Sequence, residues 1–230
     1  MANSFVLIHT VPPLVQVFDK LCAERLPGVI PFHVLDEPLL EQVRLDGSLK
    51  PGSIAQLQAH VKTAERIGAA AVLVTCSTLS PGVEQIRAGI RVFKIDEAMI
   101  SKAVTMGSRI GVIATNQTTL NPTRQLLLDQ AERMGKSVEA ELSWVDHALP
   151  ALLDGDGQIH DQLVRERIRD LADRVDVIVL AQASIARVLE IIPESDRAIP
   201  ILASPNTAIE RVREWFEGGR SKIIGDQEGK

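Results

Sequence analysis

The 230-residue sequence has few aromatic residues and little net charge. Aromatic side chains make up 3% of the chain, tyrosine is absent, and the formal net charge is −5, with acidic and basic residues interspersed. Nucleic-acid binders need basic patches and stacking aromatics, so we expect no nucleic-acid partner. No apolar run is long enough to cross a membrane, and the start of the chain lacks a basic, apolar leader. We therefore expect a cytoplasmic protein with no membrane partner.

Metal and nucleotide motifs are also missing. The two cysteines, Cys22 and Cys76, fit neither a zinc spacing nor a disulfide framework. Neither glycine-rich phosphate motif, G-x-G-x-x-G or G-x-x-x-x-G-K-[ST], occurs, so nothing predicts a dinucleotide or a nucleoside triphosphate. With 45% hydrophobic and 24% charged residues, the composition is typical of an ordinary globular protein.

The pattern of apolar runs predicts an α/β fold in two similar halves. The run that ends at Val74 follows a predicted helix and is apolar throughout, which is typical of a strand buried on both faces of a parallel sheet. The same alternation of helices and short apolar strands begins again near residue 98, with a second central strand over 176–181. We predict two Rossmann-like domains with parallel sheets.

Polar residues follow the leading and the central strand of each half, at 9–12, 76–80, 115–119 and 182–184. Open α/β sheets bind ligands at the carboxyl ends of their strands. Two halves that face each other would bring these four tips into one cleft, where we expect the substrate. The tips are rich in hydroxyls and amides and poor in Lys and Arg, so they suit a small carboxylate held by neutral donors.

Cys76 is the candidate reactive group, because it lies at the carboxyl end of the first central strand, just before a predicted helix. The field of a helix N-terminus lowers the pKa of a thiol. The alternative is that Cys76 is a small buried hydrophobe, as we expect for Cys22. His9 and His147 are candidate proton carriers, whereas His33, His60 and His160 are expected to be structural. Asp36, Glu37, Asp96 and Glu97 are expected as solvated residues near helix starts.

Three local expectations concern helix boundaries. The residues near 83–88 predict a short helix, and Asn121 with Pro122 predict the cap and first turn of a helix that runs to Met134. The last helix is expected to end near Gly218, followed by a mobile polar tail over 221–230.

Several segments together resemble the aspartate/glutamate/hydantoin racemase superfamily. They are Cys76-Ser77-Thr78, Ile95-Asp96-Glu97-Ala98, and Ile110 to Thr115 leading to Thr118-Thr119, with His9-Thr10-Val11-Pro12 matching some branches. The resemblance implies two α/β domains related by a pseudo-twofold axis, here 1–97 plus 205–220 and 98–204, with the final helix packed on the first domain. It also implies a small carboxylate substrate, no cofactor, and one catalytic cysteine from each half. A homodimer or higher homo-oligomer is expected from the frequency of such assemblies.

The sequence departs from the family where the second cysteine would stand, because Gln182 occupies that position. A carboxamide cannot exchange a proton at ordinary pH. We therefore expect a cofactor-independent, racemase-like isomerase that uses Cys76 as proton carrier or nucleophile. The alternatives are a single-cysteine lyase, decarboxylase or hydrolase of the same superfamily, and a carboxylate-binding protein without catalysis. The expected catalytic residues are Cys76, Gln182 and His147. The expected substrate-binding residues are His9, Thr10, Ser77, Thr78, Thr115, Asn116, Thr118, Thr119, Ala183 and Ser184.

Overall fold

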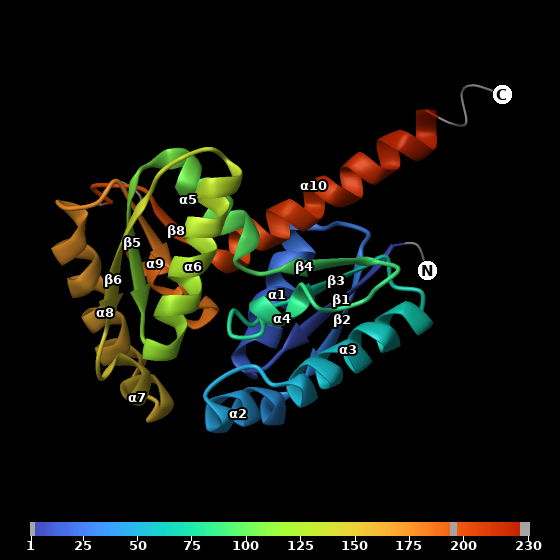
Figure 1. Ribbon diagram of the computed structural model, residues 1–230, viewed down its shortest axis with the longest axis horizontal. Helices are drawn as coiled ribbons and strands as arrows, with labels where there is room; N and C mark the ends of the chain where they lie inside the picture. The colour runs from blue at the N-terminus through green and yellow to red at the C-terminus, as the bar shows by residue number, and fades with distance from the viewer. Residues whose placement is uncertain (1–2, 194–196, 226–230) are drawn as a thin grey trace.

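The computed structural model describes residues 3–193 and 197–225 and shows two α/β lobes side by side (Figure 1). Each lobe contains a four-stranded sheet in which all neighbouring strands are parallel. The strand orders are β2-β1-β3-β4 and β6-β5-β7-β8, so both lobes use the same topology. The predicted fold class is confirmed.

The first lobe contains the strands β1 to β4 and the helices α1 to α4. Its strands are β1 (Ser4–His9), β2 (Ile30–Leu35), β3 (Ala71–Val74) and β4 (Arg91–Lys94), and its helices are α1 (Pro13–Arg25), α2 (Glu37–Asp46), α3 (Pro51–Arg66) and α4 (Ser80–Val83). Strands β1 and β3 are buried along their whole length, as their unbroken apolar runs require. Side chains alternate between two apolar cores, so that Ala71 and Leu73 lie in one and Val72 and Val74 in the other.

The second lobe repeats this arrangement around β5 and β7. Its strands are β5 (Arg109–Ala114), β6 (Glu139–Trp144), β7 (Val177–Leu180) and β8 (Ile201–Ala203). Its helices are α5 (Glu97–Met106), α6 (Gln117–Arg133), α7 (Ala148–Leu153), α8 (Gly157–Ala172) and α9 (Val188–Ile191), with a 3-10 turn η1 (Ala183–Ile185) after β7.

The last helix, α10 (Ser204–Gly225), starts at the junction of the lobes and runs over the first one (Figure 1). Its buried residues Ala208, Ile209, Val212 and Phe216 join the apolar core that contains Phe5. The helix continues past the predicted stop at Gly218, so that prediction is wrong, because the helical backbone tolerates the glycine there. Residues 226–230 of the expected tail lie outside the described residues.

Two other predicted helix boundaries are also wrong. Helix α4 occupies Ser80–Val83 rather than the residues near 83–88, because Pro81 supplies a first-turn residue immediately after the strand tip. Helix α6 begins at Gln117, where the Asn116 side chain caps it by accepting a hydrogen bond from Thr118 N–H at 3.2 Å. This cap precedes Pro122, which therefore lies inside the helix.

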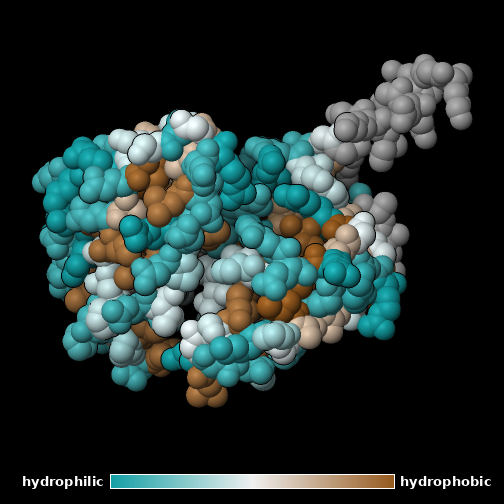
Figure 2. Space-filling model, in the orientation of Figure 1, coloured by the Kyte–Doolittle hydropathy of each residue, from teal (hydrophilic) through white to brown (hydrophobic). Residues whose placement is uncertain are grey.

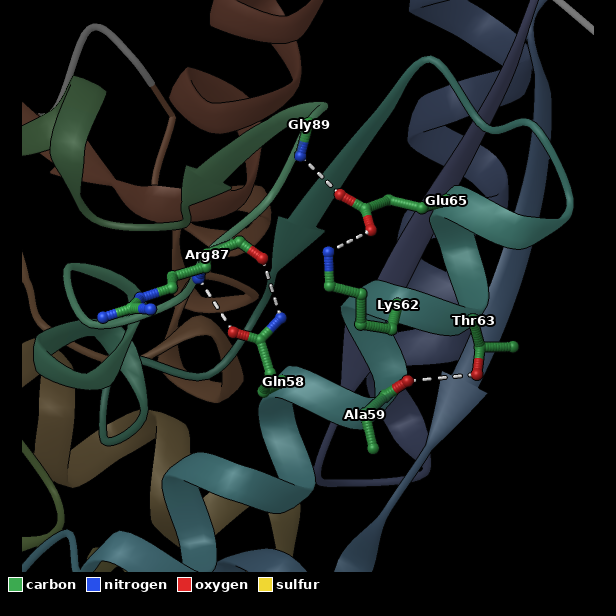
Figure 3. Close-up of polar contacts among 7 residues, drawn as sticks. All are labelled: Gln58, Ala59, Lys62, Thr63, Glu65, Arg87 and Gly89. Carbon is green, nitrogen blue, oxygen red and sulfur yellow. Dashed lines mark hydrogen bonds and ion pairs between the residues drawn. The ribbon is translucent and has the colours of Figure 1, made fainter.

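The loop between α4 and β4 is fixed to helix α3 (Figure 3). Gln58 bonds the Arg87 backbone twice: the Arg87 N–H donates to Gln58 Oε1 at 2.8 Å, and Gln58 Nε2 donates to the Arg87 carbonyl at 2.9 Å. Two turns further along α3, the Glu65 carboxylate accepts from the Gly89 N–H and from Lys62 Nζ. These contacts set the position from which β4 enters the sheet.

No helix in the described part of the chain combines the length and the apolar character that a membrane span requires.

Candidate functional site

The carboxyl ends of the strands in the first lobe hold Cys76, which follows β3 by two residues. Its side chain is 8% exposed and lies in the apolar core with Val72, Val74 and Leu79. Burial raises the pKa of the thiol, and this effect outweighs the neighbouring donors that lower it, the hydroxyls of Thr10 and Thr78 and the backbone N–H groups of Thr78 and Leu79. The donors favour a thiolate at this position, but the surrounding apolar side chains keep the free protein in the thiol form.

Two of the expected first-lobe residues surround this thiol. Thr10 is buried, and its hydroxyl is one of the groups that lower the thiol pKa. Thr78 is half-buried and contributes both its hydroxyl and its N–H. Ser77 is half-buried, and its carbonyl accepts the Ser80 N–H at 3.2 Å.

His9 faces inward rather than toward a cleft. It is fully buried, with Nδ1 2.8 Å from the Thr75 hydroxyl and Nε2 2.9 Å from His33 Nδ1. His33 Nε2 in turn lies 2.9 Å from the Asp19 carboxylate. Burial lowers the pKa of His9 to about 4, with repulsion from His33 as a second cause and attraction by Asp19 opposing both. His9 is therefore uncharged at neutral pH and joins β1, β2 and α1 through His33.

In the second lobe, Gln182 is held by three donors. Its Oε1 accepts from the Thr115 N–H at 2.7 Å, the Asn116 N–H at 3.0 Å and the Thr115 hydroxyl at 3.1 Å. Three converging donors assign this atom as the oxygen, so the orientation of the amide is fixed. Within residues 3–193 and 197–225 no acceptor bonds Nε2, and this nitrogen is accessible to solvent. The Gln182 side chain can therefore donate a hydrogen bond through Nε2 to a group in the solvent-accessible space next to it.

The remaining second-lobe residues form the support of this group. The Asn116 Oδ1 accepts from the Thr118 N–H and, at 2.9 Å, from the Thr118 hydroxyl. Thr119 is buried, and its carbonyl accepts the Thr123 hydroxyl. Ala183 packs against the apolar core of the first lobe. Ser184 is half-buried in η1, which contacts α1. The tip that carries Gln182 therefore lies against the first lobe, and the surface is hollowed where the two lobes meet, on the side away from α10 (Figure 2).

His147 lies on an exposed turn before α7. Its side chain is 83% exposed, its φ is 63°, and its Nε2 lies 3.3 Å from Asp146 Oδ2. The described contacts of His147 include neither Cys76 nor Gln182, so its catalytic role stays a prediction without structural support.

Two carboxylates expected in solvent are buried, so that expectation is wrong for Asp36 and Asp96. Asp36 caps α2 and accepts from Leu39 N–H at 3.1 Å, Gln56 Nε2 at 2.6 Å and His60 Nε2 at 2.6 Å. Burial raises the pKa of Asp36, but the hydrogen bonds from His60, Gln56 and Leu39 outweigh it and lower the pKa. The Asp36 carboxylate therefore has a structural role, because its oxygens accept these three hydrogen bonds.

Asp96 is different, because neither of its carboxyl oxygens has a hydrogen-bond partner among the described residues, although it is only 3% exposed. Burial raises its pKa to about 6, while the Ser80 hydroxyl and the Lys94 ammonium lower it and Glu97 raises it further. The position of Asp96 directly after a strand did not reveal this burial, because an acid at such a position can point either to solvent or to the core.

Comparison with known proteins assigns the family. The model of the Asp/Glu/Hydantoin racemase family matches residues 10–212, which is most of the chain. The chain belongs to this family. The resemblance inferred from the sequence is therefore confirmed. None of the curated protein sequences matches the chain significantly. Membership of a racemase family supports an enzyme of the isomerase class.

Solved structures agree with this fold. Aspartate racemase from Picrophilus torridus is 12% identical with a TM-score of 0.73, over 93% of this chain and 94% of its own. Glutamate racemase RacE1 from Bacillus anthracis is 12% identical with a TM-score of 0.67, over 94% and 82%. Allantoin racemase from Klebsiella pneumoniae is 19% identical with a TM-score of 0.65, over 94% and 88%. At these identities the similarity concerns the fold.

No group of three or more His, Cys, Asp or Glu side chains within the described ranges is arranged to hold a metal ion.

Proposed function

We propose that this protein is an isomerase that acts, without a cofactor, at the carbon next to a carboxylate of a small acid, with Cys76 as proton carrier or nucleophile. The observation that carries the proposal is the placement of the Cys76 thiol among the hydroxyls of Thr10 and Thr78 and the N–H groups of Thr78 and Leu79. These donors stabilise the thiolate form that a base or nucleophile needs.

Gln182 has a different role in this proposal. Because its Oε1 is held by Thr115 and Asn116, its Nε2 is the group that remains to donate. A fixed donor of this kind stabilises negative charge that develops on a carboxylate when the neighbouring carbon loses its proton. Racemisation needs a proton carrier on each face of that carbon, and Gln182 cannot supply the second one.

The fixed orientation of Gln182 also favours a second candidate, a lyase in which Cys76 protonates one face of a carbanion formed by decarboxylation. A single proton carrier is sufficient for that reaction. The two candidates differ in their products, because the lyase releases carbon dioxide whereas the isomerase conserves every atom of the substrate.

The test is solvent-proton exchange in deuterated water, followed by proton NMR. Candidate substrates are aspartate, glutamate, hydantoins, allantoin and substituted malonates, the first four suggested by the family and its structural neighbours. We expect one class to acquire deuterium at the carbon next to the carboxyl or carbonyl group, and we expect Cys76→Ala to lower that rate by about 10²–10⁴-fold.

The matched control is Cys22→Ala, since Cys22 is also a buried thiol but lies in the opposite core of the first lobe, where burial raises its pKa to about 12. Exchange that survives in Cys76→Ala would remove Cys76 from the mechanism. Binding of a carboxylate with neither exchange nor carbon dioxide release would identify a non-catalytic binding protein instead.

We further propose a homodimer or a higher homo-oligomer, which analytical ultracentrifugation would detect as a mass of at least twice that of one chain.

A further inference from the structure

The buried Asp96 carboxyl is poorly satisfied. Neither of its oxygens makes a hydrogen bond of regular geometry with the described residues, and neither does the buried Ser80 hydroxyl, although that hydroxyl is close enough to lower the pKa of Asp96. An unpartnered buried carboxyl destabilises a protein, and such groups are concentrated at functional sites.

The register of the sheet brings Asp96 and Cys76 to corresponding positions just after two paired strands. Val74 of β3 pairs with Lys94 of β4, and the Ile95 N–H donates to the Val74 carbonyl at 3.1 Å. Cys76 lies two residues after Val74, and Asp96 lies two residues after Lys94, so the two residues occupy corresponding positions. Neighbouring strands are about 4.8 Å apart, so groups at matching positions are within reach directly or through one hydroxyl.

Both side chains also belong to the same face of the sheet. Cys76 shares its core with Val72 and Val74, whereas Phe93 and Ile95 lie in the opposite core. Because side chains alternate along a strand, Asp96 follows Ile95 onto the face of Cys76. Ser80, the first residue of α4, lies four residues after Cys76 in the chain, and its hydroxyl acts on the Asp96 carboxyl.

We propose that Asp96 is the proton partner of Cys76, so that one negative charge is shared between the carboxyl of Asp96 and the sulfur of Cys76. In the step considered, the S–H bond of Cys76 breaks and an O–H bond forms on Asp96, directly or through the Ser80 hydroxyl. The negative charge moves from the carboxylate to the sulfur, and the total charge of the pair is unchanged. The inference rests on the proposed function for its role in turnover, but the pairing itself does not require a substrate.

In this pairing the Asp96 carboxylate provides an acceptor for the thiol proton inside the apolar region, while its negative charge suppresses loss of that proton to solvent. Ionising both groups would place two negative charges in an apolar region, which is unfavourable, whereas moving one charge between them is not opposed by that repulsion. The charged groups that face Asp96 are Lys94, which also pairs with Glu84, and Glu97, which also pairs with Arg91. Around Cys76 the facing groups are the uncharged donors of Thr10, Thr78 and Leu79.

The test is the pH dependence of alkylation by iodoacetamide in a Cys22→Ala protein, in which Cys76 is the only thiol. With Asp96 present, we expect the rate to rise up to about pH 6, to level off while the pair carries one charge, and to rise again in the alkaline range. In Asp96→Asn the plateau is absent, and the rate continues to rise about tenfold per pH unit. At pH 8 the variant is expected to react 10- to 100-fold faster than the parent.

Turnover is expected to change in the opposite direction, because Asp96→Asn removes the group that accepts the thiol proton. We expect deuterium exchange to fall at least 10-fold, while alkylation at pH 8 rises. A merely structural role would not move the two rates in opposite directions. Glu97→Gln is the matched control, since it removes the adjacent, partly exposed carboxylate and is expected to keep the plateau.

Identical alkylation profiles for the parent and Asp96→Asn would overturn the pairing, even if Cys76 proves essential for exchange. A plateau without turnover of any acid would support the pairing and contradict the proposed function. If Asp96→Asn and Asp96→Ala both unfold, carbon-13 NMR of the Cys76 β-carbon in the Cys22→Ala protein decides the matter. Two ionisation steps are expected there, one near pH 6, and a single alkaline step would overturn the pairing.

Discussion

The two lobes share one topology but differ in the state of their strand tips. At the tip of the second lobe, the Gln182 oxygen is bonded by three donors and its orientation is fixed. At the tip of the first lobe, the buried carboxyl of Asp96 and hydroxyl of Ser80 make no hydrogen bond of regular geometry with residues 3–193 and 197–225. A satisfied network stabilises a fold, whereas unsatisfied buried groups destabilise it. In the proposed function, the first lobe therefore supplies the reacting groups and the second lobe supplies the rigid donor.

The largest expected effect on stability comes from Gln182→Leu. This change removes the acceptor of two backbone N–H groups and one hydroxyl. Each such group, when left unpaired and buried, destabilises the folded state by roughly 1–3 kcal/mol. We expect a loss of about 3 kcal/mol or more in the free energy of unfolding, measured by urea denaturation.

Two other substitutions sharpen this result. Gln182→Glu keeps an acceptor at the N-terminus of α6 and is expected to lie within about 1 kcal/mol of the parent. Gln125→Leu makes the same substitution on an exposed face of α6, where the Gln125 side chain donates to Asp129, and is expected to be nearly neutral. Equal losses in Gln182→Leu and Gln125→Leu would contradict the fixed donor network.

The next largest effect concerns Asp96, whose replacement is expected to stabilise the folded protein near neutral pH, whereas Gln182→Leu destabilises it. Its pKa is raised to about 6 in the folded protein from an ordinary value of 3.8, so the folded state holds this proton more tightly than the unfolded state does. The stability that it contributes is present at low pH and is lost as the pH rises through this interval. At about 1.4 kcal/mol per pKa unit, the loss is about 3 kcal/mol.

Urea denaturation of Asp96→Asn between pH 4 and pH 7 measures this contribution. Relative to the parent, the variant is expected to gain about 2.5 kcal/mol over that range, because a small part of the loss has already occurred at pH 4. A difference that does not vary with pH would show that Asp96 is solvated or paired in solution.

A smaller effect is expected from His9, which makes the folded protein less stable as the pH falls, whereas Asp96 makes it less stable as the pH rises. Its pKa is lowered to about 4 in the folded protein from 6.5, so the unfolded state binds the proton more tightly. The parent is therefore expected to lose about 2 kcal/mol through His9 as the pH falls from 7 to 5. Substitution with a side chain that does not titrate, His9→Gln, is expected to remove this loss, as measured by denaturation at the two pH values.

Between pH 4 and pH 6.5, His9 and Asp96 thus change the free energy of unfolding in opposite directions. Replacing one of them should reveal the pH dependence of stability that the other produces. His60→Gln provides a control, because His60 is a partly exposed histidine that bonds Asp36 outside this pair. If His9→Gln and His60→Gln change the pH dependence equally, the inward placement of His9 is not responsible.

Much of the architecture was predictable because it depends on patterns that are local in sequence. The runs that form β3 and β7 are apolar throughout, and those of β1 and β5 are interrupted only at their ends, a pattern typical of strands covered on both faces. The helix starts were less predictable. Asn116 and Asn121 are both good caps by composition, and only the position of β5 determines which of them is used.

The candidate site divides in the same way. Cys76 and Gln182 could be identified from the sequence because each directly follows a buried strand. The burial of His9, Asp36 and Asp96 could not, since an acid or a histidine after a strand has the same sequence pattern whether it points to solvent or to the core.

The sequence by itself determined the two α/β lobes, the strand tips and the replacement of a second cysteine by Gln182, because periodicity and residue identity are properties of the chain alone. The tertiary structure decided which polar groups at those tips are satisfied. The donors that hold the Gln182 oxygen lie 66 and 67 residues away in sequence, and Asp96 is aligned with Cys76 only by the pairing of β3 with β4. Hydrogen bonding and desolvation depend on such distant neighbours, which a chain acquires only when it folds.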